Sequence, residues 1–404
     1  MTNRPGSGEW QVRSIDLRTL GQSSQDDSSR ALTFVKQWTE LESRALEANA
    51  YLSPHFVLPA AQHLDPNVPI FALAIERQGG DNSGQSQLAG IGIFRSVPAS
   101  KDFPLPHLVA YRSRHSFLSG LLLDRACASE AFHALLDHFR AEHRRWHGFV
   151  FQGTWGDGPT WDLMQAATKS RGMASHPWND RRRAVLSPGT DRATAEAMIA
   201  DQVRANVRRA KRLNQMGVVT WSLLRPGGIP EPTTEAFLSL EHEGWKGEDK
   251  SSLRSNPSDE AFFRAIVSKF GGDGRAIFSE LLLDGRTISS TSNFVSGRSA
   301  FAFKIGWSPE FAKASPGVQN ELALLRAVYS HEDLGDLDFW DSGATEGSYV
   351  DKLWPSRRSI VSLAVATTRL GRVALRALGT ARTLRRRYRA RTAANRAAAA
   401  NART

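Results

Sequence analysis

Ser315, Pro316 and Gly317 open a predicted helix in a way that suits the binding of an anion. A serine hydroxyl accepts hydrogen bonds from the first helical N–H groups, and proline fits the first helical position. Gly317 has no side chain, so a ligand can approach the main chain there. The unpaired N–H groups of a helix start attract negative charge. The predicted anion site comprises Ser315, Pro316, Gly317, Val318, Gln319 and Asn320.

Two carboxylates stand close to a tryptophan earlier in the same half of the chain. Glu241 and Glu243 bracket His242, just before Trp245 and Lys246. A carboxylate that is partly removed from water has a raised pKa, which suits a general base working near neutral pH. Solvated charges on a helix surface are the alternative. We take Glu241 as a candidate base, and Trp245 and Lys246 as candidate contacts to the group that it deprotonates.

A second acidic pair, Asp338 and Asp341, flanks Trp340 at the end of a predicted strand. Ligands of open α/β sheets bind at the carboxyl ends of strands. Asp341 is therefore a further catalytic candidate, and Asp338 and Trp340 are candidate substrate contacts, with loop capping as the alternative. Lys304 lies in an otherwise apolar run, where a lysine usually needs a carboxylate partner. It forms either a structural ion pair or a contact to phosphate or to the acceptor.

The histidines and the cysteine indicate no metal chemistry. His138 and His143 are five residues apart, so they do not share a helix face, and no group of carboxylates accompanies them. Cys127 is the single cysteine, which excludes an internal disulfide. We predict no metal site.

The elements that must position the candidate residues follow a recognisable order. An apolar hairpin is predicted over 275–295, a third strand over 299–305, and then the helix that opens at Ser315. A similar order of helix, antiparallel strands, helix and strand is predicted over 29–188. The fold class is therefore α/β (α+β), with tandem domains that each form a mixed, mostly antiparallel sheet flanked by helices.

We expect four segments along the 404 residues. These are a flexible start at 1–28, a first domain at 29–188, a second domain at 189–366 and an Arg/Ala-rich tail at 367–404. In the first domain, the helix that corresponds to the Gly317 helix opens with Ser129 and Glu130 and has no glycine. Because a carboxylate at a helix start repels phosphate, only the second domain is expected to hold the anion.

The net charge of +11 is concentrated near the end of the chain, because residues after Lys352 include 13 arginines and no Asp or Glu. A basic amphipathic tail is typical of contact with an anionic membrane surface, of a solvated extension, or of nucleic-acid binding. No apolar run approaches the roughly 20 residues that span a bilayer. We expect a cytoplasmic protein, with peripheral contact at the inner face of the membrane as a further expectation.

Several ordered motifs in the second domain resemble the CelD/BcsL-type, BioF2-like acetyltransferase family, whose members are tandem GNAT proteins related to Fem peptidyltransferases. They are 204–217 (RANVRRAKRLNQMG), 237–246 (FLSLEHEGWK), 283–286 (LDGR), Ser315-Pro316-Gly317, and Asp338 with Asp341. Many relatives read Gly-Asp-x-x-Tyr-Lys-x-x-Trp at the end of the pattern, whereas this chain has a longer stretch from Asp341 to Trp354.

The resemblance implies a GNAT acyltransferase in which the 315–320 helix start holds the pyrophosphate of acyl-CoA. It also implies that Tyr349 is the general acid that protonates the departing thiolate, because GNAT enzymes commonly place a tyrosine after the corresponding strand. The acyl group, acetyl or longer, would pass to an amine or hydroxyl of a cell-envelope, exopolysaccharide or lipid precursor.

Two alternatives remain open at this point. The first is a Fem-like aminoacyltransferase that uses aminoacyl-tRNA, in which the arginines of 204–212 and the tail would hold RNA. The second is a non-catalytic scaffold that binds membrane or nucleic acid. The helix start at Ser315, which suits phosphate binding, counts against a non-catalytic scaffold.

Overall fold

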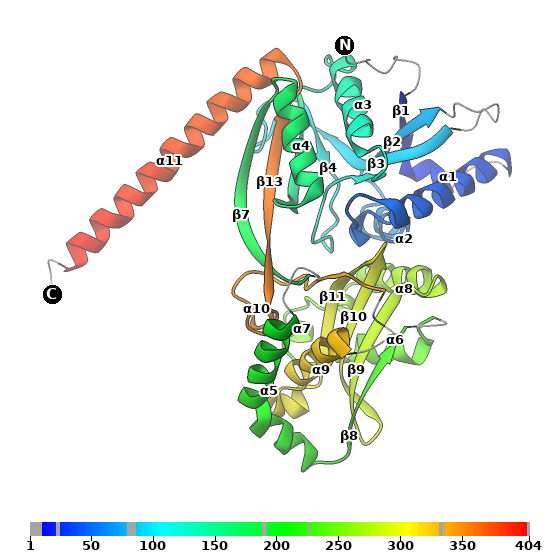
Figure 1. The fold of residues 1–404 in the computed structure, drawn as a ribbon, viewed down its shortest axis with the longest axis vertical. Coiled ribbons are helices and arrows are strands. Elements are labelled where there is room, and N and C mark those ends of the chain that lie inside the picture. The colour runs from blue at the N-terminus through cyan, green and yellow to red at the C-terminus, as the bar shows by residue number, and fades with distance from the viewer. Residues whose placement is uncertain are drawn as a thin grey trace.

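The computed structural model describes residues 10–21, 25–78, 86–187, 192–225, 228–330, 334 and 336–401. Two α/β halves lie one above the other, and a long helix extends from the upper half (Figure 1). The elements of the upper half are β1 Trp10–Asp16, α1 Gln25–Arg44, α2 Pro54–Pro59, β2 Phe71–Gln78, β3 Ser86–Val97, β4 His107–Ala110, β5 Leu122–Leu123, α3 Ala128–Ala141, β6 Gly148–Trp155, α4 Pro159–Ser170 and β7 Ala174–Leu186.

The lower half is formed by the next part of the chain, before the chain returns upward. Its elements are α5 Arg192–Asn214, β8 Val219–Leu224, α6 Glu231–His242, α7 Trp245–Glu248, α8 Pro257–Gly272, β9 Ala276–Leu283, β10 Arg286–Ser296, β11 Ser299–Trp307, α9 Pro316–Ser330, β12 Phe339–Asp341 and α10 Tyr349–Leu353. The chain ends with β13 Ser356–Ala366 and α11 Arg369–Asn401.

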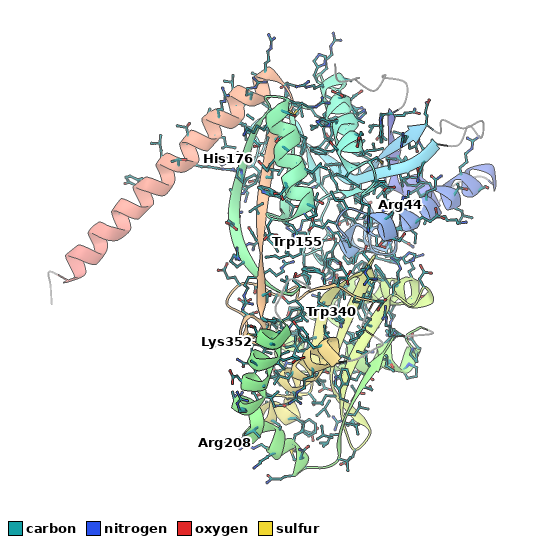
Figure 2. All side chains as sticks on the ribbon, viewed as in Figure 1. Arg44, Trp155, His176, Arg208, Trp340 and Lys352 are labelled. Carbon is teal, nitrogen blue, oxygen red and sulfur yellow. The ribbon has the colours of Figure 1, made fainter. Side chains whose placement is uncertain are left out.

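The strands of both halves join in one mixed sheet, in the order β1-β2-β3-β4-β6-β13-β7-β12-β11-β10-β9-β8, with β5 paired to β3. Helices flank this sheet in both halves (Figure 1). The predicted fold class is confirmed. Trp340, on the short strand β12, lies near the junction of the halves (Figure 2).

The predicted hairpin forms as β9 and β10, with Leu283 opposite Arg286. Its two turn residues, Asp284 and Gly285, have positive φ angles of 49° and 80°. Positive φ at both central positions is the geometry of the tight turn whose twist matches that of the flanking strands, and an Asp-Gly pair favours it. The local sequence therefore determines this part of the fold.

The final strand departs from the expected division of the chain. The sequence places Ser356–Ala366 in the second domain, but β13 pairs with β6 and β7 of the upper half. Val361, for example, lies opposite Thr154. Residues 359–366 of β13 are buried on both faces, which suits a central strand. The upper sheet is therefore completed by a strand that follows the lower half in sequence.

Strands β11 and β12 separate soon after they meet. Their parallel pairing covers only Ser299 to Phe301 on β11, whereas β11 continues to Trp307. The register between β10 and β11 also shifts, so that Ser292 lies opposite Lys304 and Asn293 opposite Ala302, which leaves Phe303 as the extra residue of a bulge. Bulges and splayed strands free backbone groups for ligands.

Candidate functional site

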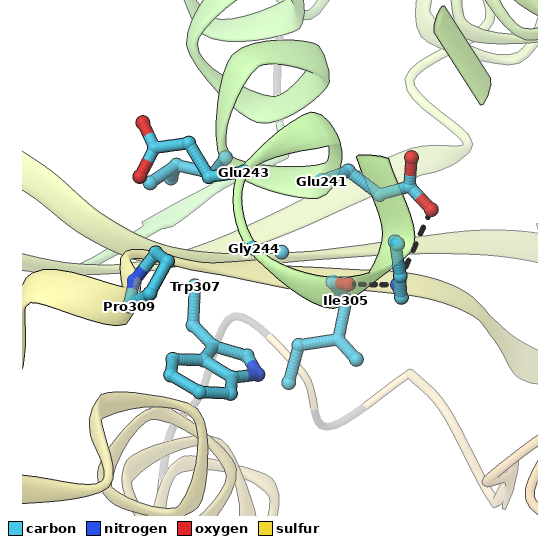
Figure 3. A pocket seen from close by; sticks show the side chains of 9 residues that line it. Glu241, Glu243, Gly244, Ile305, Trp307 and Pro309 are labelled. Carbon is cyan, nitrogen blue, oxygen red and sulfur yellow. Dashed lines mark hydrogen bonds and ion pairs between the residues drawn. The ribbon is translucent and has the colours of Figure 1, made fainter. Parts of the chain in front are cut away.

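A small pocket of about 60 Å³ lies beside the free part of β11, between this strand and the segment that joins α6 to α7. Its lining residues include Glu241, Glu243, Ile305, Trp307 and Pro309 (Figure 3). A pocket of this volume has room for a few atoms, so it suits the reacting end of a substrate.

The start of α9 lies next to this pocket. The carbonyl of Ser315 accepts the Gln319 N–H at 3.1 Å, and Ser315 has a left-handed φ of 49° instead of the extended backbone of an ordinary N-cap. A methyl group added at Gly317 would lie 3.3 Å from Trp307 Cδ1 and 3.4 Å from Ile305 Cδ1. Gly317 therefore lets the helix start sit close against the free end of β11.

The remaining predicted members of the anion site point in different directions. Asn320 is fully buried, and its Oδ1 accepts hydrogen bonds from Trp221 Nε1 at 3.0 Å and Ser279 Oγ at 2.7 Å. Its side chain thus ties α9 to β8 and β9. Gln319 lines a separate cavity between α5 and α9, and Val318 packs against the core there. Pro316 and Gly317 are buried at the helix start.

Glu241 and Lys246 form a buried link between α6 and β11. Lys246 Nζ donates to Glu241 Oε1 at 3.2 Å and to the Ile305 carbonyl at 2.7 Å (Figure 3). The Leu253 N–H donates to Glu241 Oε2 at 2.8 Å, and Glu241 is 1% exposed. Both oxygens of this candidate base are therefore occupied.

Glu243 and Lys304 differ from that pair, because neither side chain has a hydrogen-bond partner among the residues that the structure describes. Glu243 is exposed and lines the pocket. Lys304 is half-buried, and burial lowers its pKa while the nearby Glu241 opposes the shift. Its Nζ lies 5.6 Å from the ring centre of Phe303, the bulge residue. Trp245 lies in α7, but its side chain is outside what the structure describes.

The acidic pair near β12 is held in two ion pairs. Asp341 is fully buried, and its Oδ2 lies 3.1 Å from Arg183 Nη1 on β7, while its Oδ1 accepts the Gly343 N–H at 3.0 Å. Asp338 is paired on the surface with Arg298 through both oxygens. These carboxylates therefore hold the strand junction, and Trp340 is buried in the core of the lower half.

Tyr349 is the first residue of α10, and the charge of Glu321, in the second turn of α9, acts on it. The carboxylate of Glu321 accepts the Trp354 Nε1–H at 3.2 Å, which joins the two helices. Burial raises the pKa of Glu321 to about 7, and burial together with the Glu321 charge raises that of Tyr349. Tyr349 therefore keeps its proton at neutral pH. Glu321 lies one turn after Gly317 on the same face of the helix.

A loop of the upper half reaches the bulge of β11. His115 is buried, and its ring lies 5.6 Å from that of Phe262 in a stack and 6.1 Å from that of Phe303. Its Nε2 lies 2.7 Å from Asp259 Oδ1 at the start of α8. Burial lowers the pKa of His115 to about 4, with a further contribution from the charge of Lys304. The sequence contains no local signal for this contact.

The lowered pKa of His115 predicts a pH-dependent stability. The unfolded chain binds a proton at His115 below about pH 6.5, and the native site binds one only below about pH 4. The unfolding free energy should therefore fall as the pH is lowered from about 6.5 to about 4. The loss should reach at most about 3 kcal/mol. Asp259, Arg114 and Lys304 face the ring and set this balance.

Urea unfolding at pH 7 and pH 5 measures this loss. His115→Gln, which does not titrate, should show a smaller difference between the two pH values than the wild type. His143→Gln, at an exposed position, is the control and should leave the difference unchanged. An equal pH difference in the wild type and His115→Gln would contradict the assignment.

No cluster of three or more potential metal ligands occurs within the described ranges. Within the same ranges, no helix is both long and apolar enough to cross a bilayer.

Residues 201–346, from α5 to the loop before α10, match the family model described as an acetyltransferase (GNAT) domain. This segment of the chain therefore resembles a GNAT acetyltransferase domain. The match includes the splay of β11 and β12, the start of α9 and the pocket. No curated protein matches the chain significantly.

Two solved structures show a likeness of fold over most of the chain, and a third aligns more weakly. FemX aligns with a TM-score of 0.53 at 11% identity, covering 81% of this chain and 95% of that one. A conserved protein of unknown function from Bacteroides thetaiotaomicron VPI-5482 aligns with a TM-score of 0.50 at 9% identity, covering 83% and 97%. A tandem GNAT protein from the clavulanic acid biosynthesis pathway aligns with a TM-score of 0.40 at 14% identity, covering 89% and 99%.

Proposed function

We propose that the protein transfers an acetyl or longer acyl group from acyl-CoA to an amine or hydroxyl acceptor. The observation that carries the proposal is the splay of β11 from β12, which opens beside the glycine-containing start of α9. The first N–H groups of α9 supply charge complementarity for a pyrophosphate. The donor then extends along the free side of β11 towards the pocket.

The backbone of β11 supplies a group that can polarise the thioester. The carbonyl of Ile305 points to the free side of the strand, where Lys246 binds it. Because the N–H and C=O of one strand residue point to the same edge, the Ile305 N–H faces this side too. We assign it as the donor that stabilises negative charge on the thioester oxygen during acyl transfer.

The proton transfers are assigned to groups that are not already committed to structural bonds. Tyr349 protonates the departing thiolate, and Glu243 at the pocket rim takes the proton from the acceptor. Lys304 contacts the acceptor or the acyl carbonyl. Glu241 positions Lys246 and thereby the Ile305 peptide, and Asp341 holds the junction between β7 and β12.

The proposed acceptor is an envelope, polysaccharide or lipid precursor. This part of the proposal is supported by the resemblance of the chain to CelD/BcsL-type proteins. The Fem-like alternative, with aminoacyl-tRNA as the donor, is supported by the exposed arginines of α5. Arg208 projects outward from this helix, away from the sheet (Figure 2).

The two lysines near the pocket provide the test. In an assay of thiol release from acetyl-CoA with amino sugars and amino alcohols as acceptors, Lys304→Met should lower turnover at least tenfold. Its unfolding free energy should stay near that of the wild type, because the lysine makes no hydrogen bond with the described residues.

Lys246→Met is the matched comparison. It leaves the buried Glu241 carboxylate without its counter-ion and should lower the unfolding free energy by about 3 kcal/mol. Wild-type turnover in a well-folded Lys304→Met variant would remove Lys304 from the reaction. Thiol release by neither the wild type nor any variant, across the acceptor panel, would count against acyl-CoA as the donor.

A further inference from the structure

The long helix α11 carries a stripe of exposed apolar side chains. Leu370, Val373, Leu384 and Tyr388 are exposed by 57%, 67%, 60% and 69%. Together with the exposed Ala377 and Ala381 they follow one another at intervals of three or four residues. Such spacing places them on one face of a helix. We call these six residues the apolar stripe.

The opposite face of α11 attaches the helix to the upper half. Leu375 is 2% exposed and packs with Leu378 against a small core that includes Phe103. Arg382 donates to the Lys101 carbonyl at 2.6 Å, and its guanidinium lies 4.6 Å from the ring centre of Trp178. The first part of the helix is thus held firmly, with the apolar stripe turned away from the sheet.

The charged side chains of the helix are all positive. Residues 369–401 include ten arginines and no Asp or Glu, and Arg369 and Arg376 are exposed close to the stripe. At 33 residues it is about 50 Å long, and it extends away from both halves (Figure 1). A long, exposed helix that combines apolar and basic side chains matches the interface of an anionic bilayer.

We propose that α11 lies in the headgroup region of an anionic lipid bilayer, with the apolar stripe inserted at the acyl boundary and the arginines at the lipid phosphates. Nucleic acid would satisfy the arginines but would leave the leucines and valine in water. A second copy of this helix would cover the stripe but would bring two sets of ten arginines together. The bilayer alone satisfies both features, and this conclusion does not depend on the acyl-transfer chemistry.

Vesicle sedimentation with the full-length protein tests the proposal. The protein should bind phosphatidylcholine vesicles that contain phosphatidylglycerol and should not bind pure phosphatidylcholine vesicles. The double variant Leu384→Ser/Tyr388→Ser keeps every arginine but loses apolar surface, and it should bind at least tenfold more weakly. Val207→Ser, at an exposed valine on α5, is the matched control and should bind as the wild type does.

Point variants are preferable to truncation, because removing α11 would uncover the core beneath Leu375. High salt should weaken binding of the wild type, because screening reduces the attraction between arginines and lipid phosphates. Binding of the double variant equal to that of the wild type would overturn the role of the stripe. Binding of tRNA without binding of anionic vesicles, or a wild-type dimer that the double variant cannot form, would overturn the bilayer as the occupant.

Discussion

Replacement of Tyr349 by phenylalanine is expected to lower kcat for acyl transfer from acetyl-CoA about a hundredfold, with a much smaller change in KM. A general acid acts in the transition state, so its loss affects turnover more than binding. Burial and the nearby Glu321 carboxylate raise the pKa of the phenol, which keeps it protonated at neutral pH. The change removes only the hydroxyl and keeps the ring, so the fold should tolerate it.

Steady-state measurement of thiol release gives kcat and KM for the wild type and the variant. Tyr329→Phe is the matched control. Tyr329 lies near the end of α9, away from the helix start, and its buried hydroxyl has no hydrogen-bond partner among the described residues. Its removal should leave kcat unchanged. Unchanged turnover in a folded Tyr349→Phe variant would exclude this tyrosine as the acid and direct attention to other donors near Glu321.

Replacement of Gly317 by aspartate is expected to weaken acetyl-CoA binding at least tenfold, or about 1.4 kcal/mol. The new carboxylate would stand at the α9 start, where we place the pyrophosphate. Because Gly317 is buried and an added Cβ would lie 3.3 Å from Trp307 Cδ1, urea unfolding of the variant must accompany the binding measurement, so that weaker binding is not confused with loss of the fold. Isothermal titration with acetyl-CoA measures the change.

Gly317→Asn separates charge from bulk, because its side chain has nearly the same size as aspartate. It should weaken binding less than Gly317→Asp does. Equal affinities of all three proteins would place the pyrophosphate elsewhere.

Much of the fold follows from local sequence signals. The hairpin of β9 and β10 follows from alternating apolar runs around Asp284 and Gly285, and α9 follows from Pro316 and the apolar spacing after it. These signals act over a few residues. The insertion of β13 between β6 and β7 could not be predicted in the same way, because strand pairing across the chain depends on tertiary packing.

In the candidate site, too, some features follow from the local sequence and others depend on tertiary packing. Glu241, Glu243 and Lys246 line one pocket, and Lys304 lies within reach of the Glu241 charge, but the sequence does not indicate which of them are bonded to one another. His115 enters from the other half of the chain, a contact between segments far apart in sequence. Glu321 did carry a signal, because it is the one acidic residue of α9 and stands directly before the apolar run 322–325.

The donor is the central claim, and a direct titration of the wild-type protein tests it. We expect acetyl-CoA to bind saturably with one molecule per chain, and adenosine 3′,5′-bisphosphate, which lacks the pyrophosphate and pantetheine, to bind much more weakly. Binding of aminoacyl-tRNA with no detectable binding of acetyl-CoA would contradict the account and favour the Fem-like reaction.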